Sequence, residues 1–200
     1  WGAVAYLTQS KYGRDGIEVT INSKNLSNLN LKEIYGVTGY ANSTANDNSA
    51  STTNNKTGIF DLSGCVWEYT AAYVSNGNSN IDLYGKSYAS TEINLDGHKT
   101  LSTKYATVYP YDSSNLGTTY NNLKSETYGF GDAILETSNR TGAASNSWNS
   151  DYSSFPYSSS PFFLRGGYYD NISDAGTFAF RSISGYTDSN CGFRSVLVAL

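Results

Sequence analysis

Charged side chains are scarce in this sequence of 200 residues. Asp, Glu, Lys and Arg make up only 15% of the chain, and the formal net charge is -4. The lysines and arginines are scattered singly and form no basic stripe, which argues against a nucleic-acid partner. The polar surface must therefore come from Asn, Ser, Thr, Gly and Tyr.

Histidine occurs once, as His98 in the turn-like stretch LDGHKT. A hydrolase triad would depend on it, and no Gly-x-Ser-x-Gly nucleophile elbow exists, so we interpret His98 as an exposed loop residue. Glu126, Asp132 and Glu136 could serve acid–base chemistry, but no pattern pairs any two of them. The stretch GFGDAI at Gly129 lacks the third glycine and the preceding strand of a dinucleotide-binding loop. The sequence predicts no catalytic site.

Cysteine occurs twice, as Cys65 and Cys191, and no CxxC pair is present. A zinc site would need further soft ligands, which one histidine cannot supply. In an exported protein the two cysteines could form one disulfide. We favour two independently buried thiols, and the disulfide stays open as the alternative.

Long apolar runs and an initiator methionine are both lacking. No run approaches the length of a membrane span. The chain begins at Trp1 without a signal sequence, and we expect it to be a fragment whose export or anchoring segment has been removed. The length fits a single domain with an ample core.

Tyrosine is abundant, with 18 residues against 8 Phe and no Met. Tyr combines a large, stiff contact area with a hydroxyl at its tip, which binding surfaces favour. A polar, weakly charged coat on a secreted β-rich protein would have the same composition. The composition is therefore compatible with a binding face and with an ordinary polar surface.

The residue pattern predicts an α+β domain with short strands, few helices and long loops. Apolar spacing predicts a helix over 1–13, alternation predicts a strand over 17–22, and the dense apolar segment GIFDLSGCVWEYT predicts a buried strand around Val66, Trp67 and Tyr69. Further expected elements are a helical turn at 132–136, polar insertion loops at about 41–57 and 145–160, and strands at 162–166, 177–181 and 193–199.

Three ordered motifs then point to a family. Gly64-Cys65-Val66-Trp67-Glu68-Tyr69, Arg165-Gly166-Gly167-Tyr168-Tyr169 and Gly192-Phe193-Arg194 resemble the G-N-V-W-E-W, R-G-G-S-W and G-F-R segments of C-type-lectin-like domains of the formylglycine-generating-enzyme type. The first departs by Cys for Asn and Tyr for Trp, and the second by two tyrosines. The resemblance implies a C-type-lectin-like fold over the single domain 1–200.

The enzymatic branches of that family do not fit this chain. The formylglycine-generating enzymes use a cysteine pair after the R-G-G segment, but residues 168–181 contain no cysteine. The iron-dependent ergothioneine-type relatives need three histidines. We therefore expect a protein that is not an enzyme and has no cofactor. Calcium stays open, because relatives often carry it but no dense Asp-x-Asp-x-Asp loop occurs here.

A third branch comprises the variable proteins of diversity-generating retroelements, such as phage receptor-binding proteins. There the segment between R-G-G and G-F-R is a ligand-binding face, diversified by changes at template adenines that convert Asn codons. The same segment here contains residue types reachable from Asn codons, and the resemblance implies these ligand-binding residues: Tyr168, Tyr169, Asp170, Asn171, Ser173, Arg181, Ile183, Tyr186, Thr187, Asp188 and Asn190. An ordinary surface loop in a non-diversified relative is the alternative.

A fixed framework should hold this segment. Ala175, Gly176 and Gly185 belong to it, and we expect Phe178, Phe180, Phe193 and Val196 to be buried. Arg165 and Arg194 are interpreted as structural residues that bond backbone carbonyls or a carboxylate such as Glu68. Trp148, Tyr152 and Tyr157 are candidates to extend the binding face.

The segments WGAVAYLTQSKYGRDG, GIFDLSGCVWEY and FFLRGGYYDNISDAGTFAF together resemble surface proteins of gut Firmicutes and their phages, some of which follow a pilin-like anchor. This resemblance covers nearly the whole chain. We therefore expect an extracellular, cell-surface or phage-particle adhesion domain that binds a protein or glycan on another surface. Attachment to a membrane or pilus through a missing N-terminal segment is compatible with this hypothesis. The alternatives are a pilin-like or fibre subunit and a residual formylglycine-generating-type oxidoreductase.

Overall fold

The computed structural model describes residues 1–25, 38–89, 106–110, 132–138 and 145–195, and it shows a mixed α+β chain with few helices. The elements in chain order are α1 (Gly2–Gln9), the 3-10 helix η1 (Asn48–Ala50), β1 (Trp67–Ser75), α3 (Ser79–Ala89), β2 (Thr107–Pro110), α4 (Ala133–Thr137), β3 (Ser145–Asn146), η3 (Trp148–Ser150), β4 (Tyr152–Ser153), β5 (Phe162–Arg165), η4 (Ile172–Asp174), β6 (Phe180–Ile183) and β7 (Cys191–Phe193).

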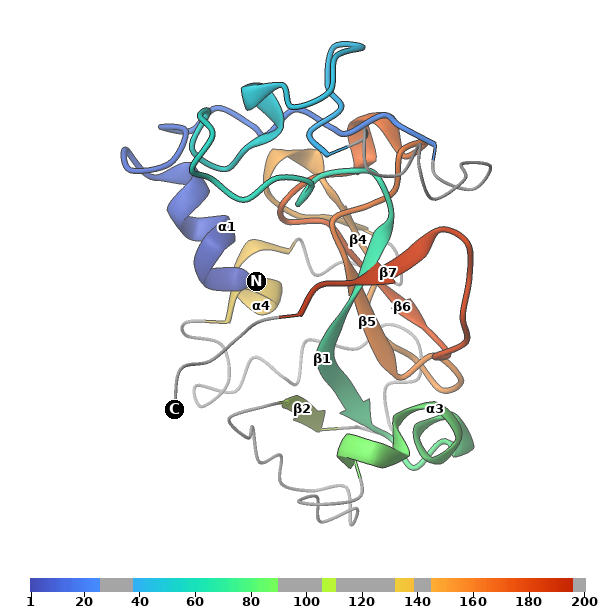
Figure 1. Cartoon of the computed structure of the whole chain (residues 1–200). Coiled ribbons are helices and arrows are strands. Elements are labelled where there is room, and N and C mark those ends of the chain that lie inside the picture. Colours follow the sequence, from blue (N-terminus) through green and yellow to red (C-terminus); the bar gives the residue numbers. More distant parts are fainter. Residues whose placement is uncertain (26–37, 90–105, 111–131, 139–144, 196–200) are drawn as a thin grey trace, which may run out of the picture.

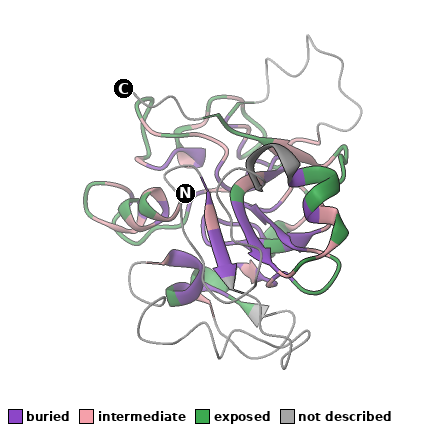
Figure 2. Ribbon diagram, turned by 90° about the horizontal axis from the view of Figure 1, so that it is seen from below, coloured by how far each residue is buried: buried purple, intermediate pink, exposed green. Residues whose placement is uncertain are grey.

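The strands form one mixed sheet in the order β2-β1-β5-β6-β4-β3, and β7 also pairs with β1 (Figure 1). The pairs β1–β5 and β5–β6 are antiparallel, whereas β1 is parallel to both β2 and β7. The long strand β1 lies at the centre because its first residues pair with β5 on one side and β7 on the other. The strands are largely buried (Figure 2).

Alternation along the strands gives the sheet two faces. One is covered by α4 and by the start of the chain: Phe163 and Phe180 pack there with Ile134 and Leu135 of α4. We call the other the tyrosine face. It is defined by the register-matched side chains of Trp67, Tyr69, Leu164, Arg181, Ile183 and Cys191.

The two helices beside the covered face begin and end for identifiable reasons. The Asp132 carboxylate accepts hydrogen bonds from the backbone N–H groups of Ile134 and Leu135, which caps α4 and confirms the helical turn predicted there. Helix α1 lies beside α4 (Figure 1). It ends at Gln9, so the prediction of helix to residue 13 was too long. Beyond it the chain turns back, and the N–H of Arg14 donates to the carbonyl of Thr8.

The strand predicted over 17–22 is wrong. This segment is extended, and only Asn22 forms a bridge, to Gly64. The N–H of Thr20 donates to the carbonyl of Ser49, which lies in η1 and not in a strand. Val19 is buried and Ile17 is exposed because this extended segment lies over the core without pairing as a strand. Its alternating pattern therefore does not indicate a sheet.

The segment predicted as a loop over 145–160 contributes two short strands, β3 and β4, to the sheet. The strand predicted over 162–166 is confirmed as β5, and the strand predicted over 177–181 lies later, as β6. The strand predicted over 193–199 shares only Phe193 with β7, which spans Cys191–Phe193. Residues 196–200, including Val196, lie outside the described part of the chain, as do His98 and Glu126.

The two framework arginines differ. Arg194 donates to the Glu68 carboxylate and to the carbonyls of Phe60 and Asp61, as predicted. Arg165 is 2% exposed, but within the described part of the chain its three guanidinium nitrogens have no hydrogen-bond partner, so the predicted bonds to carbonyls are not found there. Its guanidinium instead lies 5.7 Å from the Trp1 ring and 5.8 Å from the Phe180 ring. Cation–π stacking therefore holds Arg165 inside the fold.

None of the helices in the described ranges is long and apolar enough to cross a bilayer.

Candidate functional site

The tyrosine face rests on a buried aromatic base. Trp67 is 2% exposed and belongs to a core cluster with Leu164 and Ile183. Tyr69 is half-buried on the same cluster, and its hydroxyl donates to the carbonyl of Tyr186 at 2.7 Å. This bond joins the centre of the sheet to the loop between β6 and β7.

The loop after β5 brings Tyr168 onto this face. Gly166 and Gly167 have φ values of 90° and 79°, which side chains rarely adopt. The Asn171 side chain then accepts a hydrogen bond from the Tyr168 N–H at 2.8 Å. Tyr168 packs against the core cluster, and its ring contacts that of Tyr169 edge-to-face at 5.3 Å.

The loop between β6 and β7 lies close to Tyr69 as well. Gly185 approaches the rings of Tyr84 and Phe162, and a side chain there would meet both. Asp188 accepts the N–H of Asn190 with its carboxylate and the N–H of Cys191 with its carbonyl. These bonds fix the turn into β7, while Tyr186, Thr187 and Asp188 stay exposed.

Arg181 projects from β6 onto the same face. Its guanidinium carbon lies 5.7 Å from the centre of the Trp67 ring. The residue is exposed, although the tryptophan beneath it is buried. Among the described residues, the face therefore carries the Arg181 cation above its aromatic base and the Asp188 carboxylate at its edge.

The structure separates the predicted ligand-binding residues into three groups. Exposed side chains belong to Asp170, Ser173, Arg181, Tyr186, Thr187 and Asp188. Tyr168, Tyr169, Asn171 and Asn190 are half-buried. Ile183 is 6% exposed and packs in the core cluster, so its assignment to the binding surface is wrong.

Only some of these residues gather on the tyrosine face. Tyr168, Arg181, Tyr186 and Asp188 lie there around Trp67 and Tyr69. Ser173 instead lines a polar cavity described below, and Asn171 braces its own turn.

Phe193 corrects a framework prediction. It was expected to be buried, but it is 81% exposed. Its backbone pairs in register with Tyr69, so its side chain projects on the same side of the sheet. Sequence reasoning missed it, because an apolar residue in an edge strand carries no signal that distinguishes burial from exposure.

One of the three aromatic candidates from the 145–160 segment joins the face. Tyr152 packs on the same core cluster as Tyr168 and Cys191. Trp148 packs instead against Tyr6 and Phe178, near α1. Tyr157 lies near the other end of β1, where the Asn76 side chain donates to its carbonyl.

Both cysteines are free, as favoured from the sequence, although Cys191 is half-buried and not fully buried. Burial raises the pKa of the Cys65 thiol to about 12 and that of Cys191 to about 11. Asp188 adds to the Cys191 shift and Arg181 opposes it. Burial and the neighbouring acidic groups also raise the pKa of Tyr69. At neutral pH these groups are therefore protonated, and the charge on the face is that of Arg181 and Asp188.

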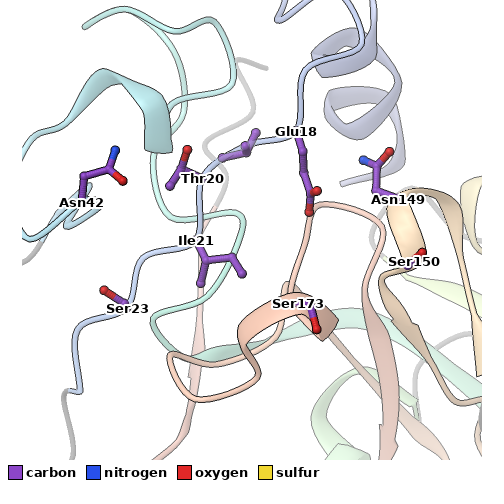
Figure 3. A pocket seen from close by; sticks show the side chains of 9 residues that line it. Glu18, Thr20, Ile21, Ser23, Asn42, Asn149, Ser150 and Ser173 are labelled. Atoms are coloured by element: carbon purple, nitrogen blue, oxygen red, sulfur yellow. The ribbon is translucent and has the colours of Figure 1, made fainter.

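A separate polar cavity of about 520 Å³ lies beside the 18–23 segment (Figure 3). Figure 3 shows the Glu18 side chain reaching between that segment and η3, toward Ser173 of η4. The remaining lining residues are Val19, Thr20, Ile21, Ser23, Asn42, Asn149 and Ser150.

The Glu18 carboxyl group also contacts that of Asp151, which is fully buried. Burial raises the pKa of both groups, in Asp151 to about 7. Glu18 is exposed as a whole residue, but its carboxyl end is partly desolvated. The two carboxyl groups therefore share a proton more readily than an exposed pair would.

The acidic candidates for catalysis have structural partners. Asp132 accepts from the Tyr109 hydroxyl at 2.6 Å besides capping α4, and Glu136 accepts from the Tyr6 hydroxyl. Within the described residues, no cluster of three or more His, Cys, Asp or Glu side chains could hold a metal ion. Among the arrangements described, the aromatic and charged surface of the tyrosine face is the one best suited to binding another molecule.

Comparison with family models, with curated proteins and with solved structures finds no match for this chain.

Proposed function

We propose that this chain is an extracellular ligand-binding domain, and that the tyrosine face binds a protein or glycan partner. The observation that supports the proposal is that three predicted binding residues come together on one face. Tyr168, Arg181 and Tyr186 come from three successive segments and meet over one buried base, Trp67 with Tyr69. Tyr and Arg above a rigid sheet have the composition of energetically dominant contact residues.

We further propose a C-type-lectin-like fold of the formylglycine-generating-enzyme type. In support, the three motifs lie on neighbouring strands. Glu68 of β1 pairs with Arg165 of β5 on one side and with Gly192 of β7 on the other. Segments about a hundred residues apart in the chain thus meet at one point of the sheet.

The distribution of burial supports a diversified segment. The framework residues Ala175, Phe178 and Phe180 are fully buried, whereas most positions reachable from Asn codons are exposed or half-buried. Side chains at exposed positions can change without altering the core. A near-copy of the coding DNA for this segment, differing only at adenines and next to a reverse transcriptase gene, would establish diversification.

The binding proposal is tested with two probes: a phage-displayed random peptide library is selected on the immobilised domain, and a glycan microarray is incubated with the labelled domain in solution. Ligands selected on the wild type should lose binding when Tyr168, Tyr169 and Tyr186 are replaced together by Ala. Tyr12→Ala and Tyr157→Ala form the matched control, since both tyrosines are exposed elsewhere. Selected ligands that bind the triple variant and the wild type equally would refute the assignment.

A second candidate function is a subunit of a fibre or pilus. The observation that favours it is exposed apolar area near the start of the chain, where Leu7 is 57%, Tyr12 90% and Ile17 64% exposed. Such area is often covered by another subunit. Light scattering of the purified protein distinguishes the two functions, because a fibre subunit should assemble with rising concentration and a monomeric binding domain should not.

We propose no enzymatic role. A residual thiol oxidoreductase would need a reactive thiolate, and burial raises the pKa values of both cysteines far above neutrality.

A further inference from the structure

Arg181 stacks on a buried side chain of the protein beneath it. Its guanidinium stacks over Trp67, which is itself fixed in the core between Leu164 and the other cluster residues. The neighbouring strand supports its backbone, since Arg181 pairs in register with Leu164. Stacking on a buried indole restricts the long side chain, so less conformational entropy is lost when it binds.

The charge of Arg181 is not used within the described part of the protein. The ion pair found there joins Arg194 to Glu68, and Arg181 takes part in no ion pair or side-chain hydrogen bond. The acidic residue placed on the face, Asp188, uses a carboxylate oxygen to accept the N–H of Asn190. Arg181 thus presents an oriented set of donors to whatever covers the face.

The surroundings of Arg181 are those of an interface centre. Tyr69, Tyr152 and Tyr168 are partly buried around the same cluster, and Phe193 adds a largely exposed apolar ring. A partner lying on these rings would exclude water from Arg181, which strengthens a charge-assisted hydrogen bond. The planar guanidinium matches a carboxylate in a bidentate arrangement.

We propose that Arg181 is the anchor of the tyrosine face and that it binds an Asp or Glu carboxylate of a protein partner. The inference rests on the proposed binding function. A protein is favoured over a glycan because partly buried tyrosines and the largely exposed Phe193 surround Arg181, which is the aromatic and Arg composition typical of the contact residues of protein–protein interfaces. The partner therefore presents an acidic side chain within an apolar or aromatic surround.

The test uses the whole chain and a phage-displayed random peptide library. Peptides selected on the wild type should be enriched in Asp or Glu flanked by apolar residues. Their affinity should fall about 10- to 100-fold on Arg181→Gln, and also when the peptide acid is replaced by its amide. Arg181→Lys should recover only part of the loss, since it keeps the charge but not the fork.

Lys24→Gln is the matched control, because Lys24 also stacks on an aromatic ring, that of Tyr40, at 4.8 Å, in the N-terminal loops. It should leave peptide affinity unchanged.

A charge-reversal experiment tests the ion pair most directly. Arg181→Glu should abolish binding, and peptides carrying Lys in place of the acid should restore it. Thermal unfolding of each variant verifies that the fold is retained.

The following outcomes would overturn the inference. In the first, the selected peptides lack acidic residues but no longer bind Tyr186→Ala. In the second, they bind Arg181→Gln as well as wild type but no longer bind Tyr186→Ala. The binding function would then stand without the anchor. Selection of microarray glycans and no peptides would exclude a protein partner. If the selected peptides bound Arg181→Gln and Tyr186→Ala as tightly as wild type, the proposed binding function of this face would itself be overturned.

Discussion

The Arg194 guanidinium donates two hydrogen bonds to the Glu68 carboxylate, with Nη2 2.6 Å from Oε1 and Nε 3.1 Å from Oε2. Glu68 lies in the central strand β1, and Nη2 also donates to the carbonyls of Phe60 and Asp61. One side chain thus joins the end of β7 to the centre of the sheet and to the turn before β1. Burial still raises the pKa of Glu68 above its ordinary value, because desolvation outweighs the bonds from Arg194.

Replacing Arg194 by Ala should lower the free energy of unfolding by about 1–2 kcal/mol, because Glu68 would remain buried without its partner. The figure is modest because Arg194 is partly exposed to solvent. Arg194→Lys should lose about half as much, since an ammonium group cannot make the same pair of bonds. Urea denaturation measures both values. Equal stability of wild type and both variants would show that the pair contributes nothing.

Gly167 should tolerate no side chain. Its φ is 79°, and an added Cβ would lie 2.4 Å from the Cβ of Ala175. Gly16 is the control, with a φ of 82° and no atom within 4 Å of its added Cβ. Gly16→Ala should cost about 1 kcal/mol from backbone strain alone. Gly167→Ala should cost at least about 2 kcal/mol more, measured by thermal unfolding, because the turn carrying Tyr168 must shift.

A similar cost for both glycine variants would mean that the loop adapts easily around Ala175. The position of Tyr168 would then not depend on close packing of this turn, and the binding face would be less rigid than its hydrogen bonds indicate.

The central part of this fold was predictable because dense apolar and motif residues specify it. The strand around Trp67 and the strand at Phe162 are confirmed, since both are buried through most of their length. Strands β3 and β4 contain two residues each, which is too short for any period to be visible. Their pairing depends on the sheet into which they fit.

The site was predictable in position but not in detail. The chain segment containing Tyr168, Arg181 and Tyr186 does supply exposed residues on one face. Ile183 was predicted to be on the binding surface and Phe193 to be buried, and the structure shows the reverse. The sequence does not show which of two apolar residues lies under the face and which lies at its edge. The sheet order resolves them: Phe193 lies on β7, which pairs only with β1 among the described strands, whereas Ile183 lies on β6, between β5 and β4.

The two thiols should react slowly in the folded protein. Burial raises the pKa values of Cys65 and Cys191 to about 12 and about 11, so few thiolates exist at pH 8. We expect Ellman's reagent to modify both cysteines at least about 10-fold more slowly in buffer than in denaturant, and Cys65 more slowly than Cys191. Cys65→Ser and Cys191→Ser assign the two rates. Fast modification of native Cys65 would contradict its burial.

Asp151 should make the protein more stable in mild acid than in mild alkali. Its Oδ2 accepts the N–H of Phe178 at 2.8 Å, and its carboxyl group contacts that of Glu18. Burial is the main cause that raises its pKa from 3.8 to about 7; Glu18 adds to the shift, while Arg165 and the Phe178 N–H oppose it. Between these two pKa values the folded state binds a proton that the unfolded state has released. The free energy of unfolding therefore falls as the pH rises through this window.

We expect a loss of about 1–2 kcal/mol between pH 5 and pH 8 from this group, measured by urea denaturation at each pH. Asp151→Asn should flatten that dependence and be more stable than wild type at pH 8, because the amide oxygen still accepts from Phe178 and no charge is buried. Asp170→Asn is the control, since Asp170 is exposed. If Asp151→Asn kept the full pH slope, the pH dependence would come from other groups, and the protonation of Asp151 in the folded protein would be refuted.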